Sequence, residues 1–442
     1  MLARFSGVTD RGLDTTVPPG SDGRWSRRRQ WAADGVVGFM MKQAVDHPEC
    51  ISLAAGLVDP QTLPLEATRE ATQRMLADES RARAALQYGT TEGAQRLRDL
   101  LLEYLAGLEG VSTDQLGITP DQLVLTTGSQ QLLSILCETL LDPDDICLVA
   151  DPTYYVFLGV VAGLGARAVP IESDEGGMKI ESLEETLQAL RDCGDLPRVK
   201  LVYVVSDHDN PRSVSLETPR REQLVEVVSR YSTKQQIFIL EDAAYRELYY
   251  DASPRPSVWS FDDRRQSVVL AQTFSKCFSP GLRVGFGVLP RELVGPVTDL
   301  KGNEDFGSAS FNQYLLATAI EEGLFHPHVQ RLRATYAAKR DRLAAAVTKY
   351  LGDVEGVEWL VPAGGLYIWM TLPEGVDAGW GGTLFERAVD QEQVMYVPGD
   401  LCHAGSDDVR PRNGLRLSFG VETPDRLELG VERLARAIRA EL

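Results

Sequence analysis

The sequence has few cysteines and no long apolar runs. Its six cysteines are scattered over 442 residues without a CxxC pair or a matching histidine spacing. This predicts reduced intracellular thiols, with neither a disulfide framework nor a metal site. His326 and His328, two residues apart, would lie on different faces of a helix. No run approaches membrane-spanning length, and the basic stretch "SRRRQWAADG" has no apolar segment behind it, so we expect a cytoplasmic protein.

Positive charge is also scarce. Lys and Arg total 45 against 64 Asp and Glu, a net charge of −19, which argues against nucleic acids and anionic membranes as partners. A length of 442 residues exceeds what one hydrophobic core usually supports, so two domains are expected. Residues 1–24 are rich in Gly, Pro, Asp, Ser and Thr and are predicted to form a mobile arm.

The sequence does contain a regular alternation of strand-like and helix-like segments. Seven apolar segments predict strands: 121–128, 145–150, 166–171, 200–205, 237–242, 267–273 and 284–289. This pattern predicts an α/β fold whose mostly parallel, seven-stranded sheet has helices on both faces. After residue 315, a long amphipathic helix followed by "GVEWLVPAGGLYIWMTL" and "LRLSFG" predicts a smaller α+β domain. We therefore expect a large domain over residues 51–314 and a small domain over 25–50 and 315–442.

Polar residues gather at the predicted carboxyl ends of four of these strands. Such ends form the ligand-binding edge of a parallel sheet. The candidates are Gly128, Ser129 and Gln130 after one strand, Asn210 after another, Asp242 and Tyr245 after a third, and Thr273, Ser275, Lys276 and Arg283 after a fourth. Taken singly, each motif fits an ordinary turn or loop as well as a site. Their convergence on one edge favours a binding site.

Part of this set suits a phosphate group. Residues 128–130 place free backbone N–H groups at a predicted helix N-terminus, a ready anion site. Thr273 and Ser275 supply hydroxyls, and Arg283 supplies a fork of donors that matches phosphate.

The other candidates suit an aromatic ring that bears an aldehyde. Asp242 would balance a ring cation, because a carboxylate at the floor of a sheet needs a partner. Asn210 and Tyr245 would donate to a phenolate oxygen, and Lys276 would bind the aldehyde as a Schiff base. Pyridoxal 5′-phosphate (PLP) carries all of these groups, so we predict it as the cofactor.

With these motifs in this order, the chain from about Gly38 to its end resembles the fold-type I aminotransferases of class I/II. It is most similar to the branch that contains aminoadipate, kynurenine and multi-substrate aminotransferases. The resemblance implies a PLP fold of type I and a homodimer with shared active sites. It also implies that Lys276, Asp242 and Tyr245 are the catalytic residues, with Lys276 as the base and Asp242 keeping the ring nitrogen protonated. Asn210 would contact both cofactor and substrate.

The resemblance adds four residues that the strand ends do not suggest. Gly56 in "ISLAAGLVDPQTLP" would lie near the substrate carboxylate, and Arg416 in "LRLSFG" would grip it. Tyr154 in "DPTYYVF" would stack on the cofactor ring. Tyr88 in "LQYGTTEGAQRLR" would reach the phosphate bound by the partner subunit. Without the resemblance, both tyrosines would be assigned to core packing.

One motif departs from the family pattern. Relatives usually read Asn-Pro-Thr-Gly where this chain reads Asn210-Pro211-Arg212-Ser213. The change bears on loop shape and substrate choice more than on cofactor binding. We expect the Asn210–Pro211 peptide bond to be cis, as in relatives.

The expected reaction moves an amino group from an L-amino acid to 2-oxoglutarate by a ping-pong mechanism. Phe39, Met40 and Met41 favour large aliphatic or aromatic donors, whereas the arginines at 24 and 27–29 would suit an aminoadipate-like donor. A PLP-dependent lyase or cyclase on the same fold would keep the same residues. A non-catalytic effector-binding domain of a transcription regulator is the other alternative. It would need a basic DNA-binding domain ahead of residue 38, where we expect none.

Overall fold

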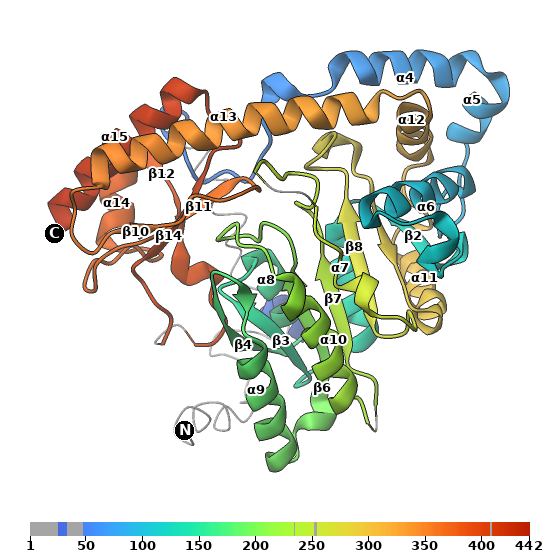
Figure 1. Cartoon of the computed structure of the whole chain (residues 1–442), viewed down its shortest axis with the longest axis horizontal. Helices are drawn as coiled ribbons and strands as arrows, with labels where there is room; N and C mark the ends of the chain where they lie inside the picture. The colour runs from blue at the N-terminus through green and yellow to red at the C-terminus, as the bar shows by residue number, and fades with distance from the viewer. Residues whose placement is uncertain (1–24, 33–46, 234, 252–253, 407–408) are drawn as a thin grey trace.

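The computed structural model describes residues 25–32, 47–233, 235–251, 254–406 and 409–442 (Figure 1). The predicted arm over residues 1–24 and the segment with Phe39, Met40 and Met41 lie outside the described residues. The α-helices are α2 (Arg27–Trp31), α4 (Leu65–Ala77), α5 (Glu79–Ala85), α6 (Gln95–Glu109), α7 (Ser129–Leu140), α8 (Tyr155–Gly163), α9 (Ile180–Cys193), α10 (Thr218–Tyr231), α11 (Arg291–Asp305), α12 (Ser310–Glu321), α13 (Phe325–Leu351), α14 (Thr383–Asp390) and α15 (Pro424–Glu441).

The larger sheet is mostly parallel, as predicted. Its strands are β2 (Leu123–Thr126), β3 (Ile146–Asp151), β4 (Arg167–Asp174), β5 (Gly177–Met178), β6 (Val199–Val205), β7 (Phe238–Asp242), β8 (Val268–Thr273) and β9 (Gly285–Val288). They lie in the order β2-β9-β8-β7-β6-β3-β4-β5. The seven expected strands are all present, and the two-residue β5 adds an eighth at the edge. Among the described strands, β9 runs antiparallel to β2 and β8, and β5 runs antiparallel to β4.

Helices cover both faces of this sheet, which explains why its strands are apolar throughout. Alternate residues of each strand belong to different cores. Cys147 and Val149 of β3 face the core that contains α7, α8 and α11. Ile146 and Leu148 face the core that contains α6, α9, α10 and α12. The sheet therefore separates two hydrophobic cores.

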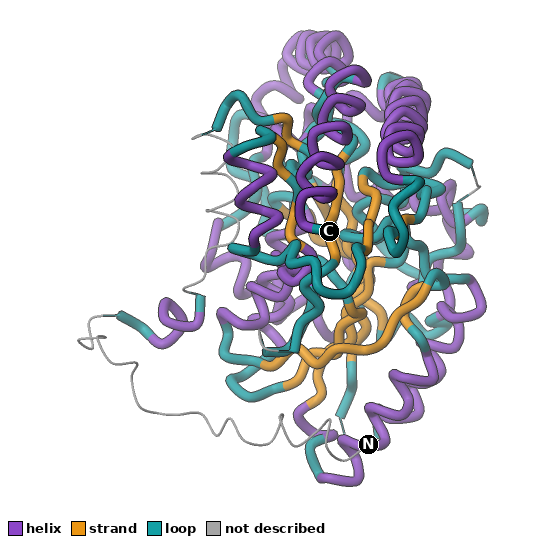
Figure 2. Tube along the Cα trace, turned by 90° about the vertical axis from the view of Figure 1, so that its left-hand side faces the viewer, coloured by secondary structure: helices purple, strands orange, loops and turns teal. Residues whose placement is uncertain are grey.

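A second, antiparallel sheet lies on the left of Figure 1, under the long helix α13. Its strands are β10 (Glu358–Trp359), β11 (Tyr367–Thr371), β14 (Gly414–Ser418) and β13 (Val397–Pro398), in that order. In Figure 2, turned so that this part faces the viewer, its helices lie above the strands. This region matches the predicted α+β unit.

Two contacts cross the domain limits that the sequence predicts. Strand β1 (Ile51–Ser52) pairs with β12 (Val394–Met395) near the smaller sheet. Helix α2 lies against α8 of the larger sheet, and Arg28 forms an ion pair with Glu138 of α7. The division at residues 51 and 315 stays a prediction.

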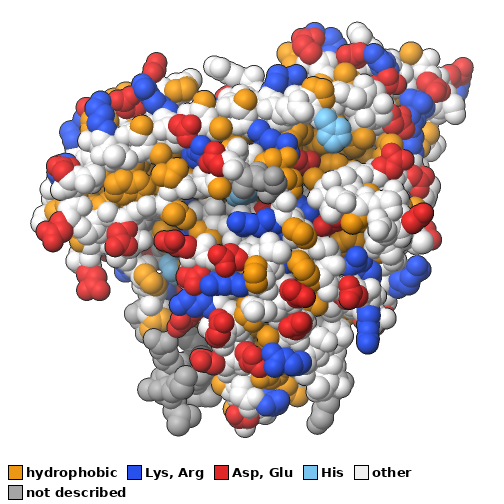
Figure 3. Space-filling model, in the orientation of Figure 1, with side chains coloured by type: hydrophobic (Ala, Val, Ile, Leu, Met, Phe, Trp, Pro, Cys, Tyr) orange, Lys and Arg blue, Asp and Glu red, His pale blue; other side chains and the backbone are white. Residues whose placement is uncertain are grey.

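The surface carries both signs of charge. Acidic and basic side chains are interspersed over the face seen in Figure 3, so the net charge of −19 is not gathered into one field there. Within the described ranges, no helix has the length and apolar character to cross a membrane. All six cysteines are free thiols.

Candidate active site

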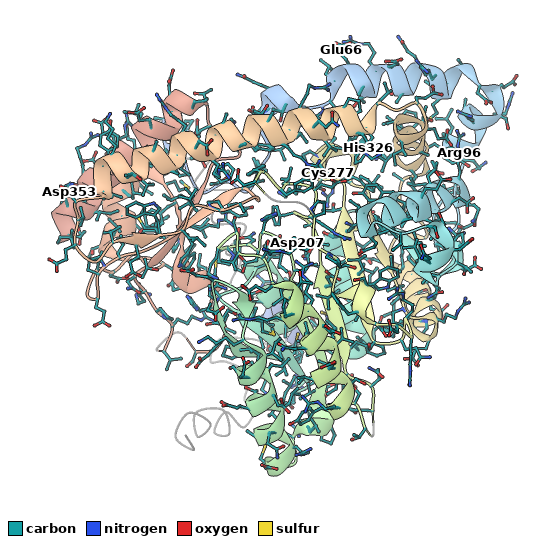
Figure 4. All side chains as sticks on the ribbon, viewed as in Figure 1. Glu66, Arg96, Asp207, Cys277, His326 and Asp353 are labelled. Carbon is teal, nitrogen blue, oxygen red and sulfur yellow. The ribbon has the colours of Figure 1, made fainter. Side chains whose placement is uncertain are left out.

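The predicted candidates meet where strands of the larger sheet end. Asp242 is the last residue of β7 and lies beside Val205 of β6 and Ala271 of β8. Since β2 runs antiparallel to β9, and β9 antiparallel to β8, the ends of β2 and β8 lie at the same edge. In Figure 4, Asp207 after β6 and Cys277 after β8 mark this central region.

The residues predicted to bind phosphate form a cup around the start of α7. We call Thr127–Gln130 the anion turn. Gly128 has φ +75°, and a Cβ there would lie 2.7 Å from Arg283 Nη2. A Cβ at Gly285 of β9 would lie 2.6 Å from the Ser129 backbone nitrogen. Both close approaches require glycine, so that backbone N–H groups and a guanidinium share one small space.

Hydroxyls and the arginine complete this cup. Arg283 Nη1 donates to Ser275 Oγ at 3.4 Å, and Nη2 donates to the Thr127 carbonyl at 3.1 Å. Thr273 Oγ1 donates to Ser275 Oγ at 3.0 Å. Gln130 lies in the first turn of α7 and is half-buried. The predicted phosphate contacts are therefore brought together.

Asp242 is a buried carboxylate without a charged partner. It is 4% exposed. Tyr203 donates its hydroxyl to Oδ2 at 3.0 Å, and the Ala244 backbone N–H donates to Oδ1 at 3.1 Å. Burial raises the pKa of Asp242 to about 6, although these two hydrogen bonds oppose the shift. None of the ion pairs among the described residues involves it, so a cation placed here would relieve the cost of its burial.

Lys276 lies just after β8 and is partly exposed. Its Nζ donates to the Gly56 carbonyl at 2.5 Å and lies 5.9 Å from the centre of the Tyr245 ring. Burial lowers the pKa of the Lys276 amine. The Tyr367 oxygen opposes this shift, and the arginine charges at 416 and 283 add to it. A lowered pKa favours the neutral amine, which is the nucleophilic form.

Arg416 of β14 reaches from the smaller sheet to the same edge. It is 2% exposed, and its Nη1 and Nη2 donate at 2.7 Å to Asn210 Oδ1 and to the Ala54 carbonyl. Its guanidinium lies 4.1 Å over the Tyr367 ring, and its buried Nε has no hydrogen-bond partner. The Tyr367 and Tyr245 hydroxyls are 2.9 Å apart. Burial, with Tyr367 nearby, raises the pKa of Tyr245.

The two tyrosines that the resemblance adds have different environments. Tyr154 precedes α8 and is half-buried, with its ring centre 5.9 Å from that of Tyr155. Burial raises its pKa, and Asp242 adds to the shift, so both side chains share one electrostatic environment. Tyr88 is 81% exposed and packs edge-on against Phe306 at 5.6 Å. Within one chain, Tyr88 is not brought to the cup.

Sequence reasoning missed two residues and misplaced one bond. Tyr203, which contacts Asp242, lies in a segment predicted as a buried strand, and Tyr367, which contacts Tyr245, lies in "GVEWLVPAGGLYIWMTL" of the predicted α+β domain. A tyrosine in a fully buried strand is the signal that could have found them, because its hydroxyl needs a partner. The prediction of a cis Asn210–Pro211 bond is wrong: among the described residues the cis bond joins Asp151 and Pro152.

One group of possible metal ligands lies among the described residues. The ligand atoms of His47, Glu49 and Cys50 lie within 4.8 Å of one another. Burial raises the pKa of the Cys50 thiol to about 11, and Glu49 adds to the shift.

The geometry fits the cofactor that the sequence predicts. Gly128 keeps open a cradle beside the Arg283 guanidinium that a methyl group would fill. The unpaired Asp242 carboxylate suits a protonated ring nitrogen, and Lys276 offers an amine with a lowered pKa at the same edge. Three chemical groups of PLP, namely the phosphate, the ring nitrogen and the aldehyde, therefore each have a matching site.

Comparisons with known proteins agree with this fit. The family model described as aminotransferase class I and II matches residues 48–434. Aromatic-amino-acid aminotransferase 1 of Thermococcus litoralis is 33% identical over 90% of this chain and 90% of its own length. The 2-aminoadipate transaminase of Thermus thermophilus is 31% identical over 89% and 91%. The structure of Pyrococcus horikoshii kynurenine aminotransferase in complex with PMP has a TM-score of 0.85 at 32% identity, covering 96% of this chain and 99% of that one. As the resemblance predicts, the chain belongs to the class I and II aminotransferases and is a PLP-dependent enzyme.

Proposed function

We propose that Lys276 carries the cofactor and moves the proton during amino-group transfer. When bound, PLP supplies an aldehyde for the amino group and a ring that accepts electrons. The neutral amine of Lys276 would take a proton from the substrate Cα and deliver it to C4′ of the cofactor. Its contact with the Gly56 carbonyl holds it beside the loop predicted to receive the substrate. The lowered pKa of this amine, at the strand edge shared with Asp242, carries the proposal.

Other residues would bind and orient. Asp242 would hold the proton on the ring nitrogen, and the anion turn with Arg283 would hold the phosphate. Asn210 and Tyr245 would contact the ring oxygen. Arg416 would fix the substrate α-carboxylate, which sets the reacting bond at the correct angle to the ring.

Labelling tests the role of Lys276. Borohydride reduction of the PLP-loaded enzyme, followed by peptide mapping, should place the label on Lys276. Lys276→Ala should remain folded, bind PLP without a covalent bond and give no transfer. A label on another lysine would overturn the assignment.

We propose large aliphatic or aromatic L-amino acids as donors and 2-oxoglutarate as acceptor. The relatives named for aromatic amino acids, 2-aminoadipate and kynurenine support this range. Arg416 can anchor any α-carboxylate, so the discrimination must come from the side-chain pocket. Each methylene buried there should add about 0.8 kcal/mol, which is several-fold in kcat/KM.

A donor series tests this range. We would measure kcat/KM for alanine, norvaline, norleucine, leucine and phenylalanine with 2-oxoglutarate, and include aminoadipate and aspartate. A rise along the series supports the proposal, whereas a flat series or a preference for aspartate contradicts it. Product that forms without any added 2-oxo acid would favour the lyase or cyclase alternative.

We further propose a cytoplasmic homodimer in which Tyr88 completes the site of the partner subunit. Tyr88 and Phe306 are 81% and 64% exposed and lie together, and Leu86 nearby is 72% exposed. Such an apolar surface favours a twofold contact. The free cysteines suit a reducing compartment.

Mixed dimers test the shared site. A Tyr88→Ala chain keeps its own Lys276, and a Lys276→Ala chain keeps its own Tyr88. Each variant alone should lose activity, while the mixed dimer should regain one complete site. No recovery in mixed dimers of confirmed composition, or full activity of a monomer, would contradict the proposal.

A further inference from the structure

A buried lysine stands behind the anion turn. Lys301 of α11 is fully buried and is not among the predicted site residues. Its Nζ donates to Asp305 Oδ1 and Oδ2 at 2.7 and 2.9 Å and to Ser308 Oγ at 2.9 Å. Burying an ammonium group is costly even when it is paired. Its partners show what this lysine arranges.

Both partners of Lys301 are linked to Thr127 by hydrogen bonds, Ser308 directly and Asp305 through Gln131. Asp305 Oδ2 accepts from Gln131 Nε2 at 2.8 Å, and Gln131 Oε1 accepts the Thr127 backbone N–H at 2.8 Å. Ser308 Oγ accepts from the Thr127 hydroxyl at 3.2 Å. An ionised Asp305 thereby fixes which end of the Gln131 amide faces the turn. Two groups of Thr127 are held from the side of α11.

The third group of Thr127 is held by a residue outside α11. Its carbonyl accepts from Arg283 Nη2 at 3.1 Å. The backbone N–H, the hydroxyl and the carbonyl of this residue are therefore all fixed, directly before Gly128 and Ser129. The orientation of the N–H groups at the start of α7 follows from that clamp.

We propose that Lys301 is a positioning residue for the cofactor phosphate, acting through Asp305 and Ser308 on the anion turn. This inference depends on the phosphate-binding role proposed above for that turn. Burial alone would raise the pKa of Asp305, but the hydrogen bonds from Lys301 and Gln131 lower it and keep the carboxylate ionised. Without the Lys301 ammonium, Asp305 and Ser308 would lose the donor that holds them in place, and the Gln131 amide and the Thr127 hydroxyl would lose their fixed partners.

Cofactor binding without turnover tests this inference. We would titrate the cofactor-free wild type and the Lys301→Met variant with PLP and, separately, with pyridoxal. Inorganic phosphate would then be added as a competitor of PLP. Lys301→Met should bind PLP and phosphate about tenfold more weakly, while pyridoxal, which has no phosphate, should bind as it does to the wild type. Lys301→Arg, which keeps the charge, should recover part of the loss.

Three further variants separate the possible outcomes. Lys339→Met removes another buried lysine, which pairs with Asp59 at 2.7 Å, and should not change the preference for PLP over pyridoxal. Ser308→Ala removes only one contact to Thr127. If Lys301→Met does not fold, the PLP and pyridoxal affinities of Ser308→Ala test the inference instead. Equal losses of affinity for PLP and for pyridoxal would overturn the inference. Unchanged PLP affinity in both Lys301→Met and Ser308→Ala would overturn it as well. Arg283→Ala tests the premise that the anion turn and Arg283 bind the phosphate. Unchanged PLP affinity in that variant would refute the phosphate site itself.

Discussion

Replacing Asp242 with Asn should stabilise the cofactor-free protein while it abolishes most of the activity. Burial raises the pKa of this carboxyl from 3.8 to about 6, which corresponds to roughly 3 kcal/mol. The folded chain binds this proton more tightly than the unfolded chain does. The resulting penalty is absent well below pH 4, grows as the pH rises to about 6 and is complete above that value. Asn removes the penalty, and its amide can still pair with Tyr203 and the Ala244 N–H.

Urea unfolding of the cofactor-free proteins measures this effect. At pH 8, Asp242→Asn should exceed the wild type in free energy of unfolding by up to about 3 kcal/mol, and at pH 5 by about half of that. The PLP-loaded variant should turn over orders of magnitude more slowly, because the ring nitrogen has lost its anionic partner. A variant with no gain at pH 8, or with the same gain at both pH values, would refute the reasoning.

Asp207→Asn is the matched control. Asp207 is also 4% exposed, but it pairs with Arg221 at 2.7 Å. Although burial opposes it, this pairing lowers the pKa of Asp207. The substitution leaves a buried guanidinium unpaired and should destabilise the protein by about 3–5 kcal/mol. The two substitutions, made in the same kind of residue at similar burial, should therefore change stability in opposite directions.

Further substitutions test the cup and the altered loop. Gly128→Ala places a methyl group 2.7 Å from Arg283 Nη2 at a φ of +75°, and a titration should show at least about tenfold weaker PLP binding; unchanged binding would contradict the cradle. Ser213 has φ +55°, and its Oγ accepts the Tyr367 N–H at 3.2 Å. Ser213→Ala and Ser213→Gly both lose this acceptor, but only Ala keeps the strain, so urea unfolding should find Ser213→Ala less stable than Ser213→Gly by about 1 kcal/mol. Equal stability of the two variants would show that this φ imposes no strain.

The sequence predicts the sheet well because parallel strands are buried on both faces. Each run of apolar residues, such as 200–205, therefore appears as β6 or one of its neighbours. The direction of β9 could not be predicted, because the apolar pattern of "VGFGVL" carries no signal for strand direction and the preceding loop sets the turn. The pairing of β6 with β7 brings Tyr203 opposite Leu240, a register that no local pattern encodes.

The candidate site divides in the same way. Lys276, Asp242 and the anion turn follow from residue types at strand ends, since one edge gathers them. Arg416 comes from β14 and is paired across the smaller sheet with Trp369, so only the resemblance suggested that it binds the substrate carboxylate. Lys301 has no signal at all in the sequence, because a lysine in an amphipathic helix is usually solvated.

Arg416 is held in place by protein acceptors. Two of its five N–H donors are already occupied, by Asn210 and by the Ala54 carbonyl, while Nε has no partner. If Arg416 grips the substrate carboxylate as proposed, an incoming acid would replace these two hydrogen bonds of the arginine with others. The number of hydrogen bonds that the arginine makes would then change little. Each half of the cycle would therefore begin and end with the same two hydrogen bonds from Arg416. The enzyme must admit an amino acid, release a 2-oxo acid and then repeat the exchange in reverse. Such an exchange of hydrogen bonds suits this cycle, because neither acid is bound too tightly to leave.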